Sequence, residues 1–192
     1  MMKSCLSGND KERDNDNKRQ IEKARQAALR KLSARERTEK EILDFLKEAG
    51  CTHEEAAEIT AEFREWGYID DEKYCRRYFE YGRSKGKAAP RIVSELTQKG
   101  ISSEKARRVL AAMKEEAGGD GWTEDRQAAL SVGMKMTAAQ RELGKAIDDK
   151  FLAKVGRRLT GLGYDSGTCY YVIGKIRDYG RERERERERE DE

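Results

Sequence analysis

The chain has 192 residues, of which 41 are Lys or Arg and 38 are Asp or Glu, and its net charge is +3 at pH 7. No run approaches the roughly 18 apolar residues that a membrane-spanning helix needs, and the N-terminal 20 residues lack the apolar stretch of a secretory signal. A membrane protein is therefore excluded, and we expect a cytoplasmic one.

The composition favours an all-helical protein. The sequence contains a single proline and is rich in Glu, Lys, Arg, Ala and Leu, which are good helix formers. Charged residues make up 41% of the chain, against about a quarter in an average domain. Disorder, a coiled coil or thin helical layers could each explain this excess. The eight Tyr, four Phe and two Trp argue against disorder of the whole chain.

The residue types of common catalytic and metal sites are scarce. His53 is the only histidine, and the four cysteines lie far apart in the sequence, so no zinc-binding spacing exists. The sequence also contains neither GxxxxGK[ST] nor GxGxxG, the phosphate-binding patterns. We therefore expect neither enzymatic activity nor a cofactor or metal.

Apolar residues and glycines repeat along the chain. The pattern of an aliphatic residue, a Leu four places later and a Gly four places after that occurs three times, as Ile42/Leu46/Gly50, Ile92/Leu96/Gly100 and Val155/Leu159/Gly163. A four-residue step is helical, and a glycine directly after the last turn favours a left-handed helix cap. Capping-box spacing occurs at 38–41 and 52–55.

The pattern predicts three tandem three-helix repeats, at residues 21–69, 70–118 and 119–180, which form an elongated array. Polar residues 1–20 are expected to be disordered. The Arg/Glu alternation of residues 181–192 is expected to form a solvated helical extension. A helix extension followed by a loop should occupy residues 137–150.

The motif Gly67-Tyr68-Ile69-Asp70-Asp71, followed by Tyr74, combines a glycine, adjacent acidic residues and aromatic residues. Adjacent acidic residues at a helix start favour an N-cap over a metal site, since consecutive side chains point in different directions. Tyr68 and Ile69 are interpreted as an apolar plug between repeats. Tyr74, Tyr78 and Tyr81 share one helix face, and all three are interpreted as core residues with solvent-exposed hydroxyl groups rather than as a base-stacking platform.

The sequence resembles the RecX family of RecA regulators in four segments. These are Arg35-Glu-Arg37-Thr38-Glu-Lys-Glu41-Ile42, Gly67 to Asp71 with Tyr74, Leu96-Thr-Gln-Lys99-Gly100-Ile101, and Leu159-Thr-Gly-Leu-Gly163-Tyr164. The resemblance covers about residues 21–179. Cys75, where the family usually has Ala, and the less basic Gly133-Met134 depart from the family pattern.

The resemblance implies a curved array of three-helix repeats without enzymatic activity. It also implies a protein that binds RecA filaments in their helical groove and suppresses ATP hydrolysis and strand exchange, in the control of recombination, DNA repair and the SOS response. Some family members bind DNA weakly. We expect a monomer.

The charge is unevenly distributed among the repeats. Residues 21–72 carry 9 basic and 14 acidic side chains, residues 73–114 carry 12 and 3, and residues 115–180 carry 10 of each. The basic middle segment fits an acidic protein surface or phosphates, although an ordinary solvated face would also be basic. The candidate partner-binding residues are Arg76, Arg77, Arg83, Lys85, Lys87, Arg91, Lys99, Lys105, Arg107 and Arg108, with Arg157 and Arg158 in the third repeat.

Two functions therefore remain open: an inhibitor of a recombinase filament, or a nucleic-acid-binding module that acts through the basic middle repeat.

Overall fold

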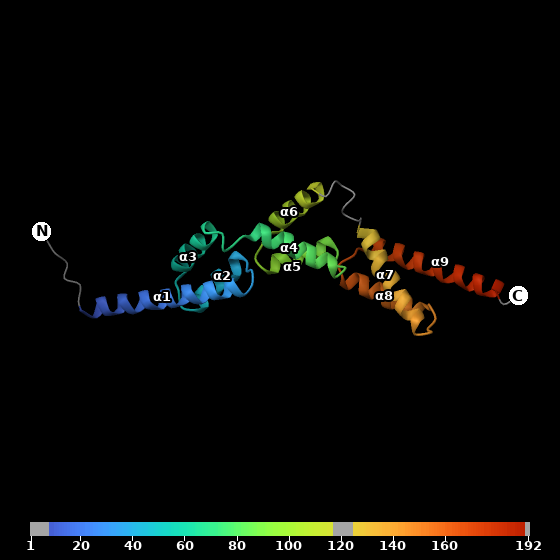
Figure 1. Cartoon of the computed structure of the whole chain (residues 1–192), viewed down its shortest axis with the longest axis horizontal. Helices are drawn as coiled ribbons and strands as arrows, with labels where there is room; N and C mark the ends of the chain where they lie inside the picture. Colours follow the sequence, from blue (N-terminus) through green and yellow to red (C-terminus); the bar gives the residue numbers. More distant parts are fainter. Residues whose placement is uncertain (1–7, 117–124, 191–192) are drawn as a thin grey trace. The chain divides into compact units, whose positions relative to one another are not determined.

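The structure is a computed structural model that describes residues 8–116 and 125–190. These residues form nine helices and no strand (Figure 1), which confirms the predicted all-helical fold of three-helix repeats. The helices are α1 (Gly8–Ala34), α2 (Glu39–Glu48), α3 (His53–Glu65), α4 (Asp71–Ser84), α5 (Ala89–Gln98), α6 (Ser103–Glu116), α7 (Asp125–Glu142), α8 (Asp149–Gly161) and α9 (Ser166–Glu190).

The helices pack into two compact units. The first unit holds α1 to α3, the start of α4 up to Cys75, and the 97–102 segment. The second holds α4 from Arg76, α5 up to Leu96, and α6 to α9. The helix order follows the three predicted repeats, whereas the packing divides the middle repeat between the two units. The repeat boundaries themselves stay a prediction.

The core of the first unit is built from small residues of α1 and large apolar residues of α2 and α3. Ala28, Ile42, Leu46 and Phe63 have at most 1% of their surface exposed. Both predicted capping boxes are present: the backbone N–H of Glu41 donates to Thr38 Oγ1, and that of Glu55 donates to Thr52 Oγ1, each at 3.2 Å. The caps thus fix where α2 and α3 begin.

The apolar core of the second unit centres on α7, α8 and α9. Val155, Leu159, Val172 and Ile176 are fully buried. Gly133 of α7 lies so close to α9 that a Cβ there would be 2.6 Å from Val172 Cγ1. The glycine therefore permits the close approach of two helices, and its place in the sequence is a packing requirement.

The glycines of the repeat end their helices as expected. Gly50 and Gly163 have φ angles of +96° and +90°, in the left-handed region. Around Gly163, its own N–H donates to Thr160 O at 2.9 Å and the N–H of Tyr164 donates to Leu159 O at 3.2 Å. These two bonds form the Schellman motif that the aliphatic/Leu/Gly pattern predicts.

The N-terminal segment differs from the expected disorder, because α1 begins at Gly8 rather than near residue 21. Two polar side chains connect this part of α1 to its own unit: Asn17 Nδ2 donates to Glu55 Oε1 at 3.1 Å, and Gln20 Nε2 donates to Ala49 O at 3.3 Å. Both contacts are made by polar side chains, so the apolar pattern of the sequence does not predict them. Residues 1–7 of the predicted tail, and the predicted boundary between the second and third repeats at 118/119, lie outside the described residues.

Candidate partner-binding surface

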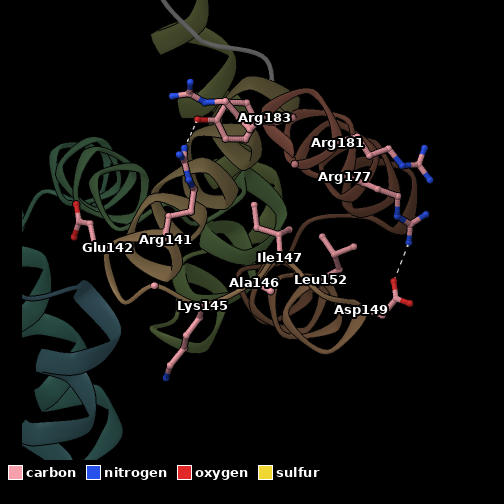
Figure 2. Close-up of a pocket in the computed structure, with 13 residues that line it drawn as sticks. Arg141, Glu142, Lys145, Ala146, Ile147, Asp149, Leu152, Arg177, Arg181 and Arg183 are labelled. Carbon is pink, nitrogen blue, oxygen red and sulfur yellow. Dashed lines mark hydrogen bonds and ion pairs between the residues drawn. The ribbon is translucent and has the colours of Figure 1, made fainter. Parts of the chain in front are cut away.

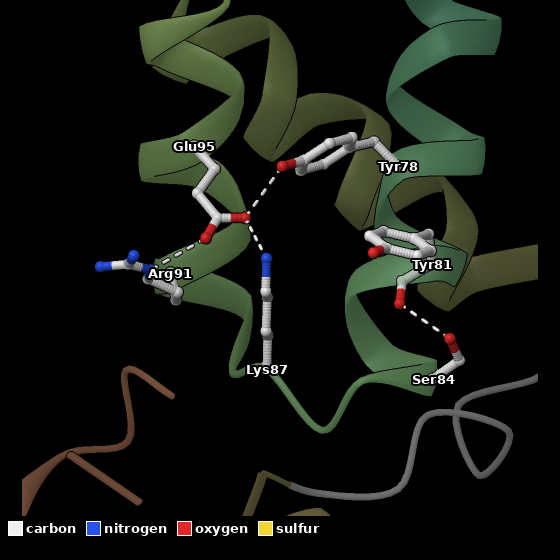
Figure 3. Close-up of polar contacts among 6 residues, drawn as sticks. All are labelled: Tyr78, Tyr81, Ser84, Lys87, Arg91 and Glu95. Carbon is white, nitrogen blue, oxygen red and sulfur yellow. Dashed lines mark hydrogen bonds and ion pairs between the residues drawn. The ribbon is translucent and has the colours of Figure 1, made fainter. Parts of the chain in front are cut away.

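Glu95 of α5 collects three donors from the middle repeat (Figure 3). Its carboxylate accepts hydrogen bonds from Lys87 Nζ at 2.6 Å, Tyr78 Oη at 2.9 Å and Arg91 Nε at 3.0 Å. Burial raises the pKa of Glu95, but the bonds from Lys87, Tyr78 and Arg91 outweigh it and hold the pKa below its usual value. Two of the predicted partner-binding cations, Lys87 and Arg91, therefore share one internal carboxylate, and the three groups together keep a net charge of +1.

Two further predicted cations are also paired. The guanidinium of Arg76 on α4 donates to both carboxylate oxygens of Glu116 on α6, at 2.7 and 2.9 Å. In the first unit, Lys99 Nζ lies 3.4 Å from Glu41 Oε1 and 5.9 Å from the centroid of the Tyr74 ring. Arg76 thus links α4 to α6, and Lys99 links the 97–102 segment to α2, pairings that a charge count does not reveal.

Two pairs of adjacent arginines, on α6 and α8, differ from these internally paired cations. Arg107 and Arg108 on α6, and Arg157 and Arg158 on α8, are exposed. None of the four forms a hydrogen bond or ion pair within the part of the chain that the structure describes. Of the predicted residues, these arginines are the best placed to contact an outside anion. Arg77 and Lys85 are also exposed, and Lys85 Nζ lies 5.6 Å from the centroid of the Tyr81 ring.

Several of the predicted cations meet at a hollow of about 650 Å³ in the second unit. Arg83, Lys85 and Lys87 reach it from the end of α4 and the loop after it, and Arg158 reaches it from α8. The loop is fixed to the third repeat, since the N–H of Ala88 donates to Leu162 O at 3.0 Å and Tyr164 Oη donates to Gly86 O at 3.1 Å.

The chemistry of this hollow suits an anion with an apolar part. Lys135 of α7 adds a fifth cation to the lining, which contains one carboxylate, that of Asp125. Lys87 is also paired with Glu95, which lies outside the lining. Val132 and Met136 supply apolar surface. Such a lining can hold carboxylates of a protein or phosphates of a nucleic acid.

A second hollow, of about 740 Å³, was not anticipated from the sequence (Figure 2). Ile147 and Leu152 lie at its centre, with Arg141 and Arg177 on either side. Arg141 Nη1 donates to Tyr179 Oη at 2.6 Å, and Arg177 Nη2 lies 3.4 Å from Asp149 Oδ1. The third repeat is neutral as a whole, so a segment-wide charge count hides this cluster. The i,i+4 spacing of Arg177 and Arg181 on α9 was the available signal.

Three residues of the 67–74 motif shape the backbone around the start of α4. Gly67 has a φ of +75°, and Asp70 Oδ1 accepts the N–H groups of Glu72 at 3.0 Å and Lys73 at 2.9 Å, as expected of an N-cap. Asp71 Oδ1 accepts the N–H of Glu39 at 3.0 Å.

The aromatic and apolar residues of this stretch divide between core and surface. Ile69 and Tyr74 are buried, whereas Tyr68 and Tyr81 are exposed and Tyr78 is half-buried. The prediction of Tyr68 as a plug and of Tyr81 as a core residue was therefore wrong. Tyr68 follows the turn at Gly67, which directs it outward, and Tyr81 lies on the wet edge of α4.

Comparison with known proteins finds a family model and several proteins of similar sequence. A sequence model of the family described as "RecX, first three-helix domain" matches residues 24–62, which lie within α1 to α3. The protein named "Regulatory protein RecX" of Mycolicibacterium smegmatis is 29% identical over 181 residues, covering 91% of this chain and 90% of that protein. The protein of the same name from Mycolicibacterium vanbaalenii is 29% identical over 157 residues, or 79% and 81% of the two chains.

These similarities confirm the resemblance of the chain to the RecX family. Two crystal structures share its fold. RecX from Lactobacillus salivarius has a TM-score of 0.62 at 22% identity, covering 82% of this chain and 96% of the other. A structure described as regulatory protein RecX has a TM-score of 0.63 at 24% identity, covering 91% and 81%.

Both of these Mycolicibacterium relatives carry the name of regulatory proteins. In the described ranges, 8–116 and 125–190, no three His, Cys, Asp or Glu side chains gather where they could hold a metal ion. No helix in the same ranges has the length and apolar character needed to cross a membrane.

Proposed function

We propose that this protein binds filaments of the RecA recombinase and inhibits their ATP hydrolysis and strand exchange, as a cytoplasmic, non-enzymatic regulator of recombination and DNA repair. The RecA partner is implied by the sequence resemblance. Similarity to proteins named as regulatory proteins supports a regulatory role.

The observation that carries the proposal is the set of unpaired arginines on the second unit. Arg107, Arg108, Arg157 and Arg158 are exposed and form no ion pair with a described residue. Arginine is well suited to bidentate contacts with carboxylates. An acidic protein surface would therefore find charge partners here without breaking any internal pair.

The test is the DNA-stimulated ATPase activity of the cognate RecA with the present protein at substoichiometric amounts. We expect inhibition well below one molecule per RecA, and we expect it to persist when DNA is in excess. No inhibition at equimolar protein would contradict the proposal.

Charge reversal tests whether the exposed arginines contact the partner. The Arg107→Glu/Arg108→Glu variant should inhibit more weakly, and its inhibition should depend less on salt, because exposed charges act mainly through the association rate. The matched control is Lys23→Glu/Arg30→Glu, which reverses two exposed cations on α1. Equal loss in both variants would indicate a net-charge effect rather than a contact.

The alternative is a nucleic-acid-binding module, which the five cations of the 650 Å³ hollow favour. In that case inhibition should disappear as DNA is raised, because the protein would only compete for DNA. Its affinity for an oligonucleotide should fall steeply with salt, in proportion to the phosphates contacted.

A further inference from the structure

An exposed aromatic pair lies at the C-terminal end of α3, in the first unit. Trp66 and Tyr68 have 56% and 55% of their surface exposed. Their ring centroids lie 6.2 Å apart in an edge-to-face arrangement, and each lies 6.2 Å from the ring of Phe63, which is fully buried. Two large rings in contact on the surface are a hydrophobic patch rather than scattered exposure.

The backbone holds this pair in place. The N–H of Tyr68 donates to Phe63 O at 2.8 Å, and the N–H of Gly67 donates to Arg64 O at 3.0 Å, so α3 ends in a Schellman turn between the two rings. The Arg25 guanidinium lies 5.4 Å from the Trp66 ring centroid and forms an ion pair with Glu62. A ring fixed in this way loses little conformational entropy when it is buried by a partner.

The charge around the pair determines which partner fits. Residues 58–73 carry six acidic and two basic side chains, and Arg25 of α1 lies against Trp66, so the net charge of these groups is −3. Phosphates would be repelled here, so base stacking of a nucleic acid on these rings is unfavourable. A basic protein surface would be attracted, and its aliphatic or cationic side chains can cover a tryptophan face.

We propose that Trp66 and Tyr68 form an anchor for a basic, partly apolar protein surface, and that this surface lies on the RecA filament. The inference rests on the proposed function for the identity of the partner. It assigns the first unit a contact of opposite charge to that of the arginines on α6 and α8. Buried aromatic residues carry a large share of binding energy at protein interfaces.

A fluorescence experiment tests the anchor independently of inhibition. The chain contains two tryptophans, so the Trp122→Phe variant of the full-length protein reports on Trp66 alone. RecA filaments assembled on DNA should shift the emission of Trp66 to the blue and protect it from acrylamide quenching. An oligonucleotide without RecA should do neither. Unchanged quenching with filaments, or protection by DNA alone, would overturn the anchor.

Substitution provides a second readout. Trp66→Ala and Tyr68→Ala should each raise the concentration for half-inhibition of the RecA ATPase about tenfold. The control is Tyr170→Ala, since Tyr170 is a tyrosine of α9 with 76% of its surface exposed. Inhibition by both variants at the wild-type concentration would overturn the anchor and leave the proposed function standing. If the wild type does not inhibit, the proposed function fails, and the quenching measurement still decides whether Trp66 is covered.

Discussion

The hydroxyl of Thr38 donates a hydrogen bond of 2.7 Å to the backbone carbonyl of Lys99, which lies 61 positions further along the chain. The same oxygen accepts the N–H of Glu41 at 3.2 Å, and the Thr38 side chain is fully buried. Thr38 therefore caps α2 and also connects it to the 97–102 segment within the first unit.

Thr38→Val should reduce the free energy of unfolding by about 2 to 4 kcal/mol. The change removes a helix cap, typically about 1 kcal/mol, and leaves the partly buried carbonyl of Lys99 without this partner. Urea denaturation followed by circular dichroism measures the loss.

Thr52→Val is the matched control, because Thr52 has the same capping box at the start of α3 but is exposed. Its loss should be about 1 kcal/mol, the value of a cap alone. Equal losses for the two variants would show that the bond to Lys99 adds nothing to stability.

Leu96→Ala and Leu159→Ala should each reduce the free energy of unfolding by about 2 to 5 kcal/mol, because both side chains are fully buried and truncation leaves a cavity. Leu143→Ala serves as the control, since 68% of the Leu143 surface is exposed. It should change the unfolding free energy by less than about 0.5 kcal/mol. A silent Leu96→Ala would refute the repeat pattern at that position.

The parts of the fold that depend on neighbouring residues could be predicted from the sequence. Capping boxes and left-handed glycines are set by hydrogen bonds that span three to five residues, so Thr38, Thr52, Gly50 and Gly163 were identified correctly. The buried leucines followed from helical periodicity, which reports which side of a helix faces the core.

The candidate surface was only partly predictable, because a charge count does not show which charges pair. Arg76 and Glu116 lie 40 positions apart and meet through the packing of α4 and α6. The cations of the 650 Å³ hollow come from different helices, among them α7 and α8. They are brought together by tertiary packing, which the sequence does not show directly. The outward direction of Tyr68 depends on the turn at Gly67.

Gly133→Ala should destabilise the protein by about 1 to 3 kcal/mol, although alanine is the better helix former. The added methyl group would lie 2.6 Å from Val172 Cγ1 and 2.9 Å from Ile176 Cδ1, both of them fully buried, and overpacking of this kind costs more than helix propensity gains. Thermal unfolding checks the sign.

Gly174→Ala is the control, because Gly174 lies inside α9 with open space where its Cβ would stand. This change should stabilise the protein by about 0.5 to 1 kcal/mol. Stabilisation by both substitutions would mean that α7 can move away from α9 at little cost.

Glu95→Gln should lower the free energy of unfolding by an amount that depends on pH. The pKa of Glu95 is lowered in the folded protein, since the bonds from Lys87, Tyr78 and Arg91 outweigh the effect of burial. A lowered folded pKa adds stability above the unfolded value, about 4.3 for Glu, and this stability is lost as the pH falls through the folded value. The difference in unfolding free energy between wild type and variant, measured by urea denaturation, should therefore be largest near neutral pH and shrink below about pH 4.

The same substitution should strengthen an interaction with an acidic or phosphate surface, because it frees Lys87 and Arg91 from their carboxylate and raises the net charge by one. The expected result at neutral pH is inhibition of the RecA ATPase at a lower concentration, with a steeper salt dependence. Glu80→Gln makes the same charge change at an exposed position of α4 for which the described structure shows no bond. Equal inhibition by the two variants would mean that Lys87 and Arg91 contribute only to the fold, and stronger inhibition by Glu95→Gln alone would place them in the contact.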